Sequence, residues 1–99
     1  MVPAITRTRR AEEDLISIWL TVAAENPTAA DRLLDAFDAR WQQLLLHPRS
    51  GVARDDIKRG IRHLVTGQYL TFYGLIDDGI EIIRVLHGRR EVTREDLRP

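Results

Sequence analysis

The spacing of apolar residues changes once along this chain, and that change limits the folds open to it. Up to residue 46 they recur every three or four positions, as on one helix face, whereas from Ile61 they alternate or run together as in strands. Two helical segments followed by three strand segments predict an α+β fold with two layers. Because 99 residues suffice for one core and not for two, we expect a single domain over residues 1–99.

The first half of the chain predicts a helical hairpin. The first helix is expected from about Thr8 to Glu25, and Asn26-Pro27 should end it because the residue before a proline disfavours the helical conformation. Thr28 and Asp31 resemble a capping box that opens a second helix, which should end at His47-Pro48. A turn this short makes the two helices antiparallel neighbours. Their apolar stripes should lie on one face of a sheet.

The second half predicts a three-stranded antiparallel meander. The segments with strand character are IRHLV, YLTFYGLI and IEIIRVLH, at residues 61–65, 69–76 and 80–87. Ile82 and Ile83 are adjacent in the last of them, so the pattern leaves the facing of this strand open, and burial on both sides is one alternative. A weaker strand over Val2 to Thr6 precedes the helices, and residues 52–60 look like a loop. The expected order is β-α-α-β-β-β, with the helices on one face and the other face left uncovered.

Composition excludes several classes of function. The chain has no cysteine, no apolar run long enough for a membrane span, and no signal-peptide core in MVPAITRTRR, so we expect a cytoplasmic protein without membrane partners. Its net charge of zero argues against a general nucleic-acid binder. His47, His63 and His87 lack the spacing of a metal site, and no glycine-rich phosphate loop is present. We therefore expect neither a metal nor another cofactor.

A series of short motifs occurs in an order that resembles the ParE-like toxins of the RelE/ParE superfamily. They are A-x-x-D-L-x-x-I-W from Ala11, N-P-x-A-A from Asn26, H-P-x-x-G from His47, a basic residue before Y-L-x-F-Y, and I-x-I-I-R-V-L-H followed by G-R-R at the end. The resemblance covers about residues 4 to 90. It implies a RelE/ParE-like fold, a helical hairpin packed on a small, mainly antiparallel sheet. It also implies the toxin of a bacterial type II toxin–antitoxin system, a group often called plasmid stabilisation proteins.

The resemblance also implies partners and leaves the target open. A ParD-like antitoxin should hold the toxin inactive, and the complex should bind operator DNA through the antitoxin. ParE-branch toxins poison DNA gyrase, RelE-branch relatives cut messenger RNA on the ribosome, and a third alternative is a non-toxic, antitoxin-binding or autoregulatory module. The chain has no tyrosine after His87, and the loop from Arg54 to Arg59 holds a single lysine. We therefore expect a gyrase inhibitor rather than a ribonuclease.

The stretch RVLHGRRE, Arg84 to Glu91, holds most of the candidate site residues. For target binding we predict His87, Arg89 and Arg90, at and beyond the end of the last strand. If the chain cleaved RNA, His87 would serve as the acid or base, with Arg62 and Arg84 holding the phosphate. The alternative for His87 is an ordinary strand-end histidine bonded to a neighbour.

Antitoxin binding is assigned to Arg62, Arg84 and Tyr73. Each arginine interrupts an apolar strand, so it should point to the open face or pair with a buried acid, because an unpaired buried guanidinium is too costly. Either the two arginines are solvated, or they bind acidic or backbone groups of the antitoxin. Tyr73 shares a strand face with Tyr69, and packing in the core is the alternative role for both.

Overall fold

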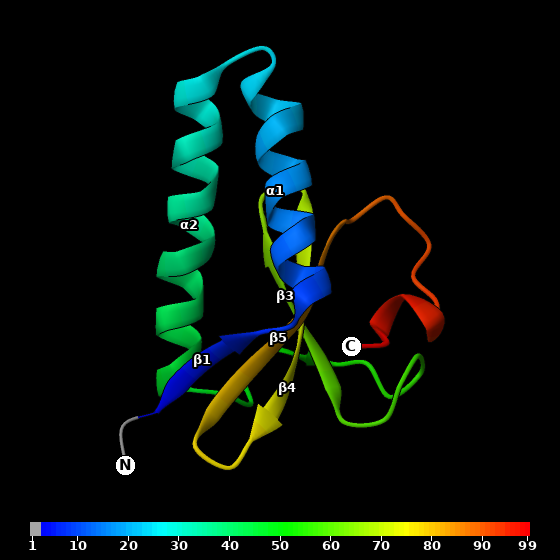
Figure 1. The fold of residues 1–99 in the computed structure, drawn as a ribbon. Coiled ribbons are helices and arrows are strands. Elements are labelled where there is room, and N and C mark those ends of the chain that lie inside the picture. Colours follow the sequence, from blue (N-terminus) through cyan, green and yellow to red (C-terminus); the bar gives the residue numbers. More distant parts are fainter. Residues whose placement is uncertain (1–2) are drawn as a thin grey trace.

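The computed structural model describes residues 3–99 as two antiparallel helices on one face of a five-stranded sheet (Figure 1). The elements in chain order are β1 (Ala4–Arg7), α1 (Arg9–Ala23), α2 (Pro27–Leu46), β2 (Val52–Ala53), β3 (Ile61–Thr66), β4 (Tyr69–Ile76), β5 (Gly79–His87) and a 3-10 helix, η1 (Glu95–Leu97). The predicted α+β fold, the helical hairpin and the meander are confirmed. Of the helices within residues 3–99, none combines the length and apolarity that a bilayer span requires.

Each of the two helices begins after a residue whose side chain caps it. Thr8 caps α1, because its hydroxyl oxygen accepts the Ala11 N–H at 3.0 Å. The prediction of a capping box at Thr28 is wrong: Asn26 caps α2 and accepts the Ala29 N–H at 3.0 Å. The physical reason is Pro27, which suits the first helical position because its backbone angle is fixed and it has no N–H to leave unpaired.

The strand order is β1-β5-β4-β3-β2, with β1 parallel to β5 and the other pairs antiparallel. The first strand begins two residues later than predicted, and Val2 lies outside the described residues. Residues 52–53, predicted as loop, form the short edge strand β2. β1 lies so close to the start of β5 that a Cβ on Gly79 would come within 1.9 Å of the Ala4 carbonyl oxygen. Glycine is therefore required where the first and last strands meet.

An irregularity in β5 explains how this strand is buried on both faces. Tyr73 pairs with Ile82 and Phe72 with Arg84, so Ile83 is an extra residue that forms a bulge. Ile82 packs into the core beneath the helices, with Phe37, Trp41 and Tyr73, while Ile83 packs on the opposite face. Of the alternatives that the sequence left open for this strand, burial on both sides is the one observed.

The prediction that the second face is left uncovered is wrong. A second apolar cluster forms there from Ile61, Phe72, Ile83, Leu86 and Leu97. Leu97 belongs to η1, so the segment after β5 turns back and covers this face (Figure 1). We call residues 88–99 the tail. The tail reads as polar in sequence, yet its one leucine is fully buried.

Candidate functional site

A buried ion pair lies where β5 passes the start of α1. The Asp14 carboxylate accepts from Arg84 Nε at 2.6 Å and from Arg84 Nη2 at 2.9 Å. It also accepts the Val85 N–H at 3.0 Å, an edge group of β5. The two side chains are only 8% and 14% exposed, and the hydrogen bond with Asp14 raises the pKa of Arg84 against the opposing effect of burial. Arg84 thus follows the alternative of a buried acid partner, and it is not solvated.

Arg84 also connects β5 to the tail. Its Nη1 donates to the Asp96 carbonyl oxygen at 2.9 Å, and the Asp96 carboxylate accepts from Arg90 Nη2 at 2.5 Å. The Thr93 N–H and hydroxyl donate to the same carboxylate at 2.9 and 3.1 Å. These hydrogen bonds, led by the one from the Thr93 backbone, lower the pKa of Asp96. A continuous polar network therefore runs from α1 through β5 to the tail.

His87 ends β5 in contact with neutral groups. Its ring packs edge-on against Tyr69, with ring centroids 5.3 Å apart. Nδ1 accepts the Arg89 N–H at 3.1 Å, and Nε2 lies 3.1 Å from the Gln68 amide oxygen. An Nδ1 that accepts and an Nε2 that faces an oxygen fit the neutral ring with its proton on Nε2. These contacts fit a strand-end histidine bonded to its neighbours.

Arg62 and Tyr73 hold the loop between α2 and β2. Arg62 Nη1 donates to the carbonyl oxygens of Arg49 and Gly51 at 3.0 and 2.9 Å. The Tyr73 hydroxyl donates to the Pro48 carbonyl oxygen at 2.7 Å and accepts the Gly51 N–H at 3.0 Å. Tyr73 is fully buried, and burial raises its pKa. Its interpretation as a core residue is confirmed.

Antitoxin contacts through Tyr73 or Arg84 stay predictions. Both side chains are buried among this chain's own groups, so either contact would require existing hydrogen bonds to be exchanged. Arg62 is partly exposed and bonded to backbone carbonyls.

The three residues proposed for RNA cleavage do not meet. Arg62 lies opposite Tyr73 and His87 lies opposite Tyr69, so their partners are four positions apart along β4. This corresponds to roughly 13 Å along the strand. Arg84 is held by Asp14 and the tail.

Comparison with known proteins assigns the family. The model for the ParE toxin of the parDE type II toxin–antitoxin system matches residues 5–92. The chain belongs to the ParE toxin family. Toxin ParE1 of Mycobacterium tuberculosis, in strains CDC 1551 and H37Rv, is 43% identical over 86 residues, which cover 85% of this chain and 88% of the relative. Toxin ParE3 of Caulobacter vibrioides is 26% identical over 92 residues, covering 92% of each chain.

A solved structure supports the ParE fold independently. The chromosomal ParDE toxin–antitoxin system from P. aeruginosa contains a chain that matches with a TM-score of 0.73, covering 87% of this chain and 96% of that one. At 20% identity this likeness shows the shared fold alone. Together with the family match, it makes this chain the ParE toxin of a ParDE-type system, which implies an antitoxin partner.

Three residues of this ParE chain that organise the site were not among those predicted from the sequence. Asp14 stands three positions after Ala11 and four before Ile18, on the apolar face of α1, and an acid on such a face signals a buried partner. Thr93 and Asp96 have the spacing of a cap, which signals a turn in the tail. Within residues 3–99, His, Asp and Glu side chains nowhere form a group of three that could hold a metal ion.

Proposed function

We propose that this ParE toxin inhibits DNA gyrase by binding it through the turn that follows β5. The observation that carries the proposal is the combination of exposed cations and neutral contacts at this turn. Arg89 is exposed, the Arg90 side chain is 47% exposed, and His87 beside them contacts an amide and a backbone N–H. Exposed arginines on a short, hydrogen-bonded turn suit binding to a protein surface.

Inhibition by binding fits these contacts better than catalysis. Cleavage of RNA needs an acid or base and phosphate-binding cations around one reacting group. Arg62 and Arg84 instead bond to this chain's own backbone and to Asp14, away from His87. We therefore propose that the toxin is not an enzyme.

The proposal includes a ParD-like antitoxin that neutralises the toxin. Its basis is the match to the parDE toxin family, in which toxin and antitoxin form one system. We further propose that the complex binds operator DNA through the antitoxin and that the toxin acts in the cytoplasm, where gyrase is found.

Supercoiling and cleavage-complex assays with purified gyrase test the target. Arg89→Ala should relieve inhibition strongly, since an arginine at the centre of an interface is typically worth about 2 kcal/mol or more. Arg90→Ala should do the same, although Arg89 gives the cleaner result because Arg90 also binds Asp96. His87→Gln should retain most of the activity, and Arg32→Ala, an exposed arginine on α2, is the matched control.

Three outcomes would contradict the proposal. Wild-type toxin that arrests growth but leaves gyrase untouched at micromolar concentration excludes this target. Ribosome-dependent cleavage of messenger RNA that His87→Ala abolishes would establish the RelE-type activity. Absence of any growth arrest on overexpression would indicate the non-toxic, autoregulatory module.

A further inference from the structure

One side-chain contact joins the turn after β5 to the folded tail. Arg90 in the turn donates through Nη2 to the Asp96 carboxylate at 2.5 Å, and Asp96 belongs to η1. The Arg90 side chain is 47% exposed, whereas that of Asp96 is only 15% exposed. The arginine therefore faces solvent, while the carboxylate that holds it lies within the folded tail.

Asp96 is itself held on several sides. Its other carboxylate oxygen accepts the Thr93 N–H at 2.9 Å and the Thr93 hydroxyl at 3.1 Å. Its carbonyl oxygen accepts from Arg84 Nη1 at 2.9 Å, and Asp14 of α1 fixes Arg84 in turn. The next residue, Leu97, is fully buried in the second apolar cluster. The Asp96 carboxylate is thus an anchor whose position is set by the core of the domain.

The contact with Asp96 leaves most of the Arg90 guanidinium available. The hydrogen bond engages Nη2, and within residues 3–99 neither Nε nor Nη1 of Arg90 donates to another group. The backbone of the turn is fixed as well, because the N–H groups of Gly88 and Arg90 donate to the carbonyl oxygens of Gln68 and His87 at 2.7 and 3.1 Å. A long side chain that is already ordered loses less conformational entropy on binding than a free one.

We propose that Asp96 is a positioning residue, which holds Arg90 in the orientation that binds the target of the toxin. The free edge of the guanidinium then receives a carboxylate of the target, the group that suits its planar set of donors. The tail both covers the sheet and supports the target-binding surface. The inference rests on the proposed function, in which the turn after β5 binds gyrase.

Competition between Asp96 and the target for Arg90 would have the opposite consequence. In that case the target would have to displace Asp96, and removal of this carboxylate would strengthen inhibition. The exposure of the two side chains favours support over competition. Arg90 is about half exposed while it is bonded to Asp96, so the target can reach it without breaking that bond.

Asp96→Asn in the full chain tests the positioning role. Asparagine keeps the size of aspartate but has a single acceptor oxygen, so it cannot hold both Thr93 and Arg90 as the two carboxylate oxygens do. The toxin concentration that half-inhibits gyrase supercoiling should rise about fivefold. Asp96→Glu keeps the charge and should lose less.

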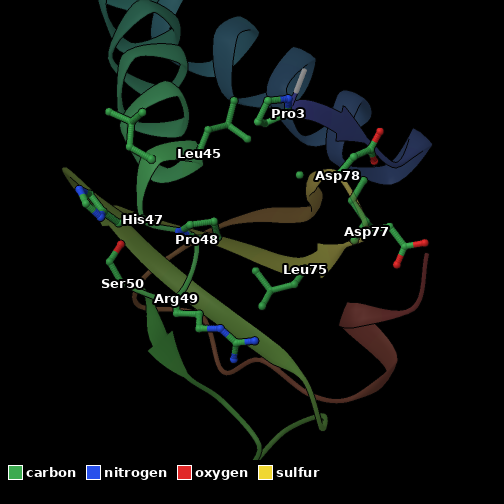
Figure 2. Close-up of a pocket in the computed structure, with 12 residues that line it drawn as sticks. Pro3, Leu45, His47, Pro48, Arg49, Ser50, Leu75, Asp77 and Asp78 are labelled. Atoms are coloured by element: carbon green, nitrogen blue, oxygen red, sulfur yellow. The ribbon is translucent and has the colours of Figure 1, made fainter. Parts of the chain in front are cut away.

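Asp77→Asn is the matched control for the loss of one carboxylate. Asp77 is exposed at the β4–β5 hairpin, where it borders a groove of about 1220 Å³ (Figure 2). The hairpin lies at the start of β5 and the turn with Arg90 follows its end, so the length of the strand, roughly 26 Å, separates them. Inhibition by Asp77→Asn should stay within about twofold of wild type.

A double-mutant cycle separates positioning from a purely structural role. If Asp96 acts through Arg90, Asp96→Asn should change inhibition by about twofold or less in an Arg90→Ala background. NMR relaxation of the Arg90 Nε–H should show a more mobile side chain in Asp96→Asn, and the melting temperature is measured for each variant. Should Asp96→Asn fail to fold, Thr93→Val removes the hydroxyl that donates to Asp96 and carries the same test with a smaller change.

Three results would overturn the inference. An equal loss from Asp96→Asn with and without Arg90 would leave Asp96 a structural role alone. Stronger inhibition by Asp96→Asn would show that it competes with the target, and full activity of Arg90→Ala would leave target binding to Arg89. Growth arrest is scored in the same variants. Wild type that arrests growth but leaves gyrase active would refute the gyrase proposal alone, and the cycle is then evaluated from growth arrest.

Discussion

The two faces of the sheet are covered by different means. On the helix face, α1 and α2 bury large apolar residues, among them Phe37 and Trp41, in one continuous cluster. On the tail face, the tail contributes the buried Leu97 and the partly buried Val92, and it is held by cations from the rest of the chain. Arg10 donates to the carbonyl oxygens of Glu95 and Arg98 at 3.1 and 2.9 Å, Arg84 to Asp96 at 2.9 Å, and Lys58 to Leu97 at 3.4 Å.

The difference shows two ways to cover an apolar sheet. Burial of large side chains contributes about 1.5 to 3 kcal/mol each and needs no particular partner atom. Hydrogen bonds from cationic side chains to the carbonyl oxygens of a short helical turn are directional. Salt and solvent can weaken the attraction between each cation and the carbonyl dipole. The helix face should therefore dominate stability, while the tail face should respond to single polar changes.

Trp41→Ala should have the largest effect and tests the helix face. Trp41 is 1% exposed, stacks on Phe37 and donates through Nε1 to the Thr71 hydroxyl at 3.1 Å. We expect a loss of about 3–5 kcal/mol in the free energy of unfolding, measured by urea titration. Trp19→Ala is the control and should cost less, because Trp19 bonds to Asp31 at the surface. Equal losses in the two variants would contradict the dominance of the helix face.

Asp14→Ala tests the strongest polar contact of the tail face. The change leaves the buried Arg84 guanidinium without its carboxylate, and we expect a loss of about 3 kcal/mol. The double variant Asp14→Ala, Arg84→Met should recover part of this loss, since no unpaired charge remains buried. A double-mutant cycle by urea unfolding measures the coupling. Additive effects would show that the pair adds nothing beyond its separate members.

The sequence predicts one face well because its signals are local. The helical stripe that contains Phe37 and Trp41 and the alternation within β3 and β4 depend on neighbours in the chain, and both elements form where expected. The start of α2 was wrong by two residues, because Asn26 and Thr28 are both capping residue types and only Pro27 decides between them.

The tail face escapes prediction because its contacts are distant in sequence. Asp14 and Arg84 are 70 positions apart, and Lys58 and Leu97 are 39 apart, so no local pattern joins them. The cost of burying an unpaired guanidinium predicted that Arg84 either reaches the open face or pairs with an acid. It could not predict that the acid is Asp14. The two-residue strand β2 gives too short a pattern to recognise.

Leu97→Ala tests whether the two faces unfold independently, and it should lower the free energy of unfolding by less than the changes above. Leu97 is fully buried against Ile61, Phe72, Ile83 and Leu86, and its truncation should cost about 2 kcal/mol, the low end for a buried leucine, because the tail can relax. Hydrogen exchange should speed up in the tail and stay unchanged in α2. Faster exchange in both places would show that the faces unfold together.

The smallest expected effect is a pH dependence confined to the tail face. His63 packs edge-on against Phe72, with ring centroids 5.9 Å apart, and its Nδ1 lies 3.0 Å from Arg54 Nη1. Burial, and then the charge of Arg54, lower the pKa of His63 below its ordinary 6.5, while Asp56 opposes them.

As pH falls below 6.5, the unfolded chain binds the proton first, so the free energy of unfolding decreases until the folded-state pKa is reached. The lowered pKa values of Asp56 and Asp96 start from 3.8, so their titration lies below this range. Urea unfolding between pH 5 and 8 should therefore show a loss on the acid side that His63→Gln flattens. An unchanged slope in that variant would remove His63 as the source and leave the tail face without a pH-sensitive contact in this range.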